Sequence, residues 1–236
     1  MPGRIGGLGP ATSGLWEAGS VRGVMVRAAG GALAGAALYA LWLRRRQLAW
    51  GATAYETAAV LPGDALLPHT DLTATRAITI RAGIDDIWPW LAQMGQGRGG
   101  LYSYDWLENL VGCHMHSIDR VVPEWQSVRE GDDFRLHPDV ALTVVAVDHP
   151  HALVVQGGIS ATGQVTTDDP AAPYDFTWAF VLVARNARST RLLIRERYRY
   201  HTFAARPMVE MVAAISFIMT ERMLRGIRDR AERHAH

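Results

Sequence analysis

The sequence has no lysine and only one cysteine, Cys113, among its 236 residues. A single cysteine excludes an internal disulfide and is compatible with a reducing compartment. Every basic residue is an arginine, which we attribute to a compositional bias of the source genome rather than to a binding device. The chain is long enough for one sizeable domain with additional segments, and its hydrophobic fraction of 49% is ordinary for a globular protein.

Motifs for a bound cofactor or metal are also lacking. The glycines of residues 95–100 (GQGRGG) do not follow a strand and open a βαβ unit, so they are a poor match to a dinucleotide site. Cys113, His114, His116 and Asp119 match no strong metal signature, because a second pair of ligands is missing. No nucleophile elbow is present. We therefore expect neither a metal nor a cofactor.

The net charge of +1 conceals an uneven distribution. Residues 1–50 carry +5, residues 51–189 carry −9 and residues 190–236 carry +5. Basic ends on an acidic body favour an anionic neighbour, most simply lipid head groups. No nucleic-acid-binding motif accompanies the arginines, so we expect no nucleic-acid partner.

Residues 21–46 are predicted to form a transmembrane helix after a disordered N-terminus, residues 1–20. Arg27 is the only charge in the apolar stretch 24–43, and the uncharged part, 28–43, spans roughly 24 Å at ~1.5 Å per residue. Because Arg27 can snorkel, the whole stretch is able to cross a bilayer. Trp42 and the arginines that follow it mark a membrane interface.

Two other interpretations of this segment stay open: a cleaved signal peptide, and a helix that lies on a membrane surface or against a partner. The arginines at 44–46 are a poor cleavage context directly after an apolar run. They also form a denser cluster than Arg22 and Arg27, which favours a cytoplasmic location for the C-terminal side. We expect a single-pass protein of the cell membrane with its soluble domain in the cytoplasm.

The rest of the chain is predicted to consist of a linker, residues 47–72, and one folded domain, residues 73–236. The domain begins with an alternating strand at 75–81, an amphipathic helix after Gly83 and a short helix at 104–111. Short strands at regular spacing indicate an antiparallel sheet. Candidates follow at residues 118–122, 133–137, 142–147 and 152–156.

The last sixty residues show the clearest pattern, with strands at 174–184 and 190–202 and a long apolar helix at 207–230. Side chains alternate across a strand with period 2, so one face of this hairpin is apolar and points inward. The opposite face carries Arg191, Arg195, Arg197 and Arg199, which we expect to point to water or to a membrane. The helix carries methionine and isoleucine at three- and four-residue steps.

Five segments resemble the SRPBCC (START-like) superfamily, which includes START lipid-transfer domains and polyketide cyclase/dehydrase-like proteins, and in particular a membrane-anchored actinobacterial branch of it. The resemblance covers roughly residues 48–234. Its segments are TRAITIRAGIDDIWPWLAQMGQGRGGLYSYDWLENLVG, RVVPEW, TWAFVLV, TRLLIRERYRY and FIMTERMLRGIRDRAE.

The resemblance implies an α+β helix-grip fold, in which a curved antiparallel sheet wraps around a long C-terminal helix, with one N-terminal transmembrane helix added. It also implies an apolar cavity between the sheet and that helix. The superfamily has no common catalytic residues, so none is carried over. The alternative to a cavity is a solid core, since methionine and aromatic side chains at these spacings also pack together.

We expect the ligand-binding residues to come from both walls of such a cavity and from its lip. They are Trp178, Phe180, Ile194, Glu196, Tyr198, Tyr200, Met211, Ile215, Met219, Arg98 and Tyr102. In this interpretation Arg98 is available to an anionic head group from a hinge or lip at residues 95–100. The alternative is that these glycines form a plain flexible loop.

Glu196 falls on the inward face of its strand, between Ile194 and Tyr198. A buried carboxylate is costly unless it is paired or protonated. It is therefore a candidate for a ligand contact or an acid/base role. The alternative is a structural acid, paired with an arginine such as Arg222 or Arg76.

Glu108 and His116 are weaker catalytic candidates. Glu108 shares one side of the short helix with Asp105 and Asn109, and paired carboxylates can perform general acid/base chemistry. A solvated face, or a role in holding the loop around Arg98, is the structural alternative.

The sequence thus favours membrane-tethered binding or transport of a hydrophobic or amphipathic small molecule, such as a lipid or a polyketide-like compound. One alternative is a cyclase/dehydratase- or hydrolase-type enzyme that uses the same cavity, with a carbonyl polarised by Arg or Tyr. Another is a non-catalytic regulatory module for a membrane partner.

Overall fold

The structure is a computed structural model that describes residues 31, 35, 37–159, 165–166 and 173–235. The chain divides into two units, Met1–Arg45 and Arg46–His236. In the first unit, the described residues 37–45 are helical. No helix among the described residues has the length and apolar character needed to span a membrane, and most of the segment predicted to do so, 21–46, lies outside them.

The second unit contains one antiparallel sheet of seven strands among the described residues, in the order β1-β7-β6-β4-β3-β2 with β5 paired to β4. Its strands are β1 (Leu72–Ile80), β2 (Asp133–His137), β3 (Val140–Asp148), β4 (Ala152–Ile159), β5 (Val165–Thr166), β6 (Tyr174–Asn186) and β7 (Ser189–Tyr200). Its helices are α2 (Ala54–Ala58), α3 (Ile84–Ala92), α4 (Asp105–Leu110) and α5 (Ala205–His234), with short 3-10 turns at Asp64–Leu66 and Pro123–Trp125.

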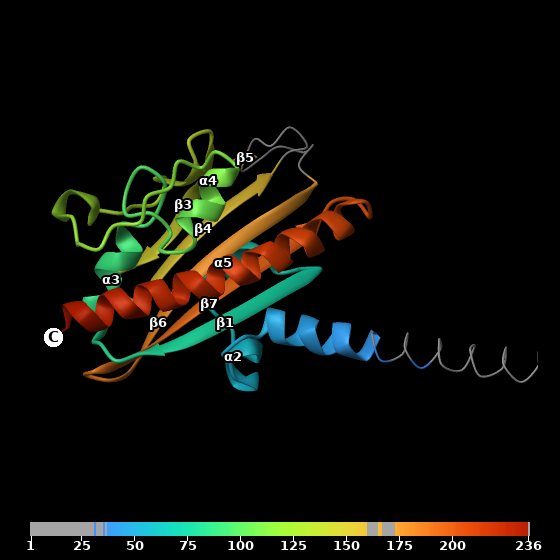
Figure 1. Ribbon diagram of the computed structural model, residues 1–236, viewed down its shortest axis with the longest axis horizontal. Helices are drawn as coiled ribbons and strands as arrows, with labels where there is room; N and C mark the ends of the chain where they lie inside the picture. The colour runs from blue at the N-terminus through green and yellow to red at the C-terminus, as the bar shows by residue number, and fades with distance from the viewer. Residues whose placement is uncertain (1–30, 32–34, 36, 160–164, 167–172, 236) are drawn as a thin grey trace, which may run out of the picture. The chain divides into compact units, whose positions relative to one another are not determined.

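The long helix α5 lies across one face of the sheet (Figure 1). This confirms the predicted α+β architecture with an antiparallel sheet and a C-terminal helix. The hairpin register also follows the predicted alternation, because Trp178 pairs with Glu196 and Phe180 with Ile194. All four of these side chains are buried on the α5 side.

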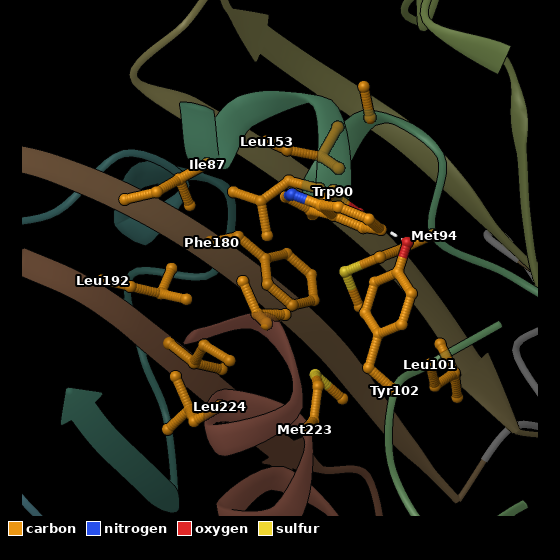
Figure 2. Packing of buried hydrophobic residues seen from close by; sticks show 14 of the residues in the cluster. Ile87, Trp90, Met94, Leu101, Tyr102, Leu153, Phe180, Leu192, Met223 and Leu224 are labelled. Atoms are coloured by element: carbon orange, nitrogen blue, oxygen red, sulfur yellow. Dashed lines mark hydrogen bonds between the residues drawn. The ribbon is translucent and has the colours of Figure 1, made fainter. Parts of the chain in front are cut away.

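The main hydrophobic core fills one end of the space between α5 and the sheet. Figure 2 shows Trp90 of α3 packed with Phe180, Met94 and Tyr102, while Met223 and Leu224 approach from α5. The contact is close, since a Cβ atom at Gly226 would lie 2.2 Å from the carbonyl oxygen of Tyr102. This end of the domain is solidly packed and fixes the C-terminal half of α5.

The predicted linker, residues 47–72, is instead part of the folded unit. It contains α2 and a 3-10 turn, and it covers the sheet face opposite to α5. Arg195, on that face, donates to Asp64 Oδ2 over 2.6 Å, and its guanidinium also binds the carbonyl oxygens of Glu56, Thr57 and Ala59.

The arginine row therefore faces this covering segment and not open water. Arg191 binds Glu56, and Arg197 binds the carbonyl oxygen of Leu67. Only Arg199 behaves as predicted, because it is half-exposed and pairs with Asp175. Local sequence patterns do not predict this arrangement, because the partners of Arg195 lie more than a hundred residues away along the chain.

The strand predicted at 118–122 is also wrong, since these residues form a loop before the turn at Pro123–Trp125. The side chain of Gln93 explains the difference. Its Nε2 donates to the Arg120 carbonyl over 3.0 Å, and its Oε1 accepts from Val122 N over 3.0 Å. A buried side-chain amide thus satisfies backbone groups that a neighbouring strand would otherwise pair.

Candidate functional site

A cavity of about 490 Å³ lies at the other end of the space between α5 and the sheet. Its volume falls within the range that small-molecule sites usually occupy. Most of its lining is apolar. The lining residues are Leu101, Leu107, Glu108, Val111, Cys113, Leu136, Leu142, Gly157, Tyr174, Phe176, Trp178, Glu196, Tyr198, Val212, Ile215, Ser216, Ile218, Met219, Thr220 and Met223.

The sheet contributes an aromatic wall to this cavity. Tyr174, Phe176 and Trp178 come from β6 and Tyr198 comes from the neighbouring β7. The rings of Phe176 and Tyr198 are 4.8 Å apart, and Phe176 lies 6.3 Å from Trp178. The indole nitrogen of Trp178 is buried, and no described residue accepts a hydrogen bond from it.

Glu196 lies on the cavity wall, but its carboxylate is fully engaged by protein. Arg76 Nη1 donates to Oε1 over 2.7 Å, and both side chains are buried. Ser216 and Thr220 of α5 donate to the same oxygen over 2.6 and 3.1 Å, and the Tyr198 hydroxyl donates to Oε2 over 3.2 Å. The structural alternative, an inward acid paired with Arg76, therefore describes Glu196; Arg222 instead lies over the ring of Tyr104.

Glu108 has the opposite character. Glu108 is only 7% exposed, and both of its carboxyl oxygens are buried with no hydrogen-bond partner among the described residues. Burial, with a smaller contribution from the charge of Asp105, raises the pKa of Glu108 to about 7. A buried polar group without a partner is costly, so such groups usually have a function or a missing partner.

The neighbours of Glu108 on α4 explain how it is held. Asp105 accepts hydrogen bonds from Ser117 N and Oγ over 2.7 and 2.6 Å, and Asn109 exchanges two hydrogen bonds with the backbone of Met115. These contacts fasten the loop after α4. The sequence placed Glu108 on one side of this helix with Asp105 and Asn109, but Glu108 lines the cavity with Leu107 and Val111, and Asp105 and Asn109 do not.

Three exposed apolar residues edge the cavity, and we call them the apolar rim. They are Val111, which is 73% exposed, and Ile215 and Ile218 of α5, which are 53% and 51% exposed. Further apolar side chains, Trp106 and Leu110 on α4, are also exposed. An exposed cluster of this kind commonly marks a surface that meets an apolar partner.

Five of the predicted ligand-binding residues line the cavity: Trp178, Glu196, Tyr198, Ile215 and Met219. Phe180 and Ile194 do not, because they are fully buried in the main core. Tyr200 packs against a smaller cluster that contains Leu72 and Val209. Met211 is 60% exposed and is absent from the lining.

Arg98 and Tyr102 also lie outside the cavity and have structural partners. Arg98 donates to the carbonyl oxygens of Ala92 and Trp125, so residues 95–100 form a fastened turn and not a pocket lip. The Tyr102 hydroxyl donates to the Trp90 carbonyl over 3.1 Å. His116 is exposed and does not line the cavity.

Sequence reasoning did not assign Cys113, Leu136 or Leu142 to the cavity, which they line from the loop after α4 and from β2 and β3. No local pattern distinguishes these residues from ordinary core. A signal for the orientation of Glu108 does exist, since Leu107 and Val111 are one helical turn apart and flank it.

Comparisons with known proteins show low similarity. No protein-family model matches the chain, and no curated protein matches it. Solved structures that resemble it include protein Ms6760 from Mycobacterium smegmatis, with 18% identity over 67% of this chain and 89% of that one and a TM-score of 0.36. Protein jhp0584 from Helicobacter pylori shares 11% identity over 74% and 96%, with a TM-score of 0.43. Norcoclaurine synthase from Thalictrum flavum shares 15% identity over 67% and 84%, with a TM-score of 0.39.

Proposed function

We propose that the folded unit binds a hydrophobic or amphipathic small molecule, such as a lipid or a polyketide-like compound, in the cavity between the sheet and α5. The observation that supports this most strongly is the cavity of about 490 Å³ beside a solidly packed core. Protein interiors are normally close-packed, so a hollow of this size favours a guest. An apolar wall with a few polar groups is typical of ligand sites.

The apolar rim supports exchange of this guest with a membrane. Val111, Ile215 and Ile218 are exposed at the edge of the cavity, where an oily ligand would otherwise cross water. The sequence of residues 21–46 supports a tether to the cell membrane, with the domain on the cytoplasmic side. A tether would raise the local concentration of the domain at the bilayer.

Blocking the cavity with a bulky side chain tests the proposal. Val212→Trp would fill part of the cavity, whereas Met211→Trp places the same ring on the next residue of α5, outside the lining. Displacement of a fluorescent apolar dye by fatty acids, sterols and aromatic polyketides would measure binding to each variant. We expect Met211→Trp to bind like wild type and Val212→Trp to bind at least ~10-fold more weakly.

The reactivity of Cys113 provides an independent measure of whether the cavity is occupied, because Cys113 is the only cysteine and it lines the cavity. A bound guest should slow its reaction with a thiol reagent. The proposal fails if wild type shows no saturable binding, or if both tryptophan variants bind equally well.

An enzyme that uses the same cavity is a second candidate, and Glu108 is the observation that favours it. A carboxyl group whose pKa is about 7 can both donate and accept protons near neutral pH. Incubation with carbonyl-containing aromatic compounds, followed by mass spectrometry, would distinguish the candidates. A carrier returns the compound unchanged, whereas a dehydratase or a dehydrating cyclase removes water from it and a hydrolase adds water.

A further inference from the structure

Glu108 is the charged side chain of the cavity that lacks a protein partner. Among the described residues, Glu108 and Glu196 are the carboxylic acids of the lining, and Arg76 neutralises Glu196. Neither oxygen of Glu108 receives a hydrogen bond from a described residue. Its position is fixed, because α4 is fastened by Asp105 and Asn109 to the loop that follows it. A rigid, unpaired acid that faces an apolar space is suited to a specific polar contact with a guest.

No cationic side chain is among the described residues that line the cavity with Glu108. The lining includes no arginine and no histidine among the described residues. On the long helix, Arg222 lies over Tyr104 and not in the lining. From β2, His137 approaches Gly112 and binds the backbone of Asp139. The charge of Asp105 is negative, and it raises the pKa of Glu108 further.

Apart from Glu196, whose charge Arg76 neutralises, the other titratable groups of the described lining stay neutral near physiological pH. Burial raises the pKa of Tyr174 to about 12 and that of Tyr198 well above its usual value. Burial, with a contribution from Glu108, also raises the pKa of the Cys113 thiol. The acidic group at the α4 side of the cavity is therefore Glu108, with the charge of Asp105 acting on it, and this arrangement disfavours an anion.

We propose that the guest carries a basic nitrogen, and that Glu108 binds the resulting ammonium group while the apolar part fills the rest of the cavity. This inference deepens the proposed function and rests on it. An ammonium group supplies both the charge and the hydrogen bonds that the carboxylate lacks. The aromatic wall of β6 and β7 adds ring faces that attract cations. A fatty carboxylate would instead face Glu108 with no counterion from the described lining residues.

The proposal sets the sign of the pH dependence. The empty site holds Glu108 protonated below about pH 7. An ammonium ligand binds the ionised form, so binding releases a proton and the affinity rises as the pH increases through 7. A neutral hydrogen-bond acceptor would bind the protonated form, and its affinity would fall over the same range.

Three probes with the same chain separate these possibilities: decylamine, decanol and decanoate. Calorimetric titration of the full-length protein at about pH 6 and about pH 8, with the solubilising medium alone as blank, measures their affinities. At the higher pH we expect decylamine to bind at least ~10-fold more tightly than decanol, and decanoate to bind most weakly. At the lower pH the preference for decylamine over decanol should be smaller, because Glu108 must first lose its proton. Binding of decylamine should then release more protons than it does at the higher pH.

Variants then assign the effect to Glu108. Glu108→Gln should lose the preference for decylamine and keep the affinity for decanol, because the shape of the cavity is retained. Glu130→Gln removes the same charge from an exposed position and should behave like wild type. Thermal unfolding of each variant verifies that it is folded.

Each outcome distinguishes this inference from the function on which it rests. If decanol or decanoate binds wild type as tightly as decylamine, or if Glu108→Gln keeps the amine preference, the inference is overturned and the cavity remains a ligand site. If none of the three probes, nor any of the larger apolar compounds, binds, the proposed function itself fails. The comparison of probes on wild type alone is decisive even if Glu108→Gln does not fold.

Discussion

Arg76 and Glu196 form a buried ion pair across two neighbouring strands, with 2.7 Å between Arg76 Nη1 and Glu196 Oε1. The pair binds the sheet to α5, because Ser216 and Thr220 donate to the same carboxylate oxygen. Arg76 also binds the carbonyl oxygen of Gln47 through Nε. One ion pair therefore connects the start of the folded unit, the sheet and the helix that closes the cavity.

Removing one member of this pair should be strongly destabilising. Glu196→Leu leaves Arg76 buried without a counterion, and we expect a loss of about 3–5 kcal/mol in the free energy of unfolding. Arg76→Met should cost a similar amount. The double variant should cost clearly less than the sum of the two, because neither charge is then left alone. Urea unfolding of the four proteins gives the coupling, and additive losses would argue against this account.

The covering segment on the outer face should depend on Arg195. Arg195→Met removes hydrogen bonds to Asp64 and to several carbonyl oxygens at the end of α2, and we expect a loss of about 3–5 kcal/mol. Proteolysis at residues 54–67 should become faster. Arg199→Met is the matched control on the same strand, since its partner Asp175 is more accessible, and it should cost less than about 1 kcal/mol. Equal effects of the two variants would contradict the covering role.

Glu108 should leave a signature in the pH dependence of stability. Its pKa is about 7 in the folded protein against an ordinary value of 4.5, so the folded state binds the proton more tightly. The contribution of Glu108 to the free energy of unfolding is complete below about pH 4.5. It falls as the pH rises to about 7 and then stays constant. The total change is roughly 1–3 kcal/mol, because water that enters the cavity screens part of the effect.

Denaturant unfolding of wild type and Glu108→Gln between about pH 4 and about pH 8 tests this expectation. The variant has no carboxyl group to titrate at position 108. The free energy of unfolding of the variant should therefore increase relative to that of wild type as the pH rises from about 5 to about 7. Parallel curves would show that Glu108 is not protonated by its burial.

The local patterns of the sequence predicted the hairpin and α5 well. Alternation along β6 and β7 has period 2, and that pattern alone puts Trp178 and Glu196 on the inner face. Arg76, which pairs with Glu196, was one of the two arginine partners that the sequence suggested. Such inferences succeed because they depend on neighbours along the chain or on one strong physical requirement.

The covering segment was beyond the reach of the same reasoning, and for Glu108 the sequence held only the weak signal of Leu107 and Val111. Residues 47–72 contain breakers and little periodicity, and only contacts with Arg195 and Arg197 from far along the chain give them a fixed place. The helix α4 has six residues, too few for its apolar face to be read reliably. Whether a residue on α5 lines the cavity or lies outside it, as with Val212 and Met211, depends on tertiary packing.

The division of α5 into a packed half and a half that borders the cavity has a consequence for how this domain can diversify. Gly226 and Leu224 lock one half against the core, whereas Val212, Ile215 and Met219 face empty space. Substitutions in the second half alter the shape of the cavity without loosening the packing of the first half against the core. Copies of one ancestral gene can thus acquire new chemical preferences while the same scaffold continues to fold.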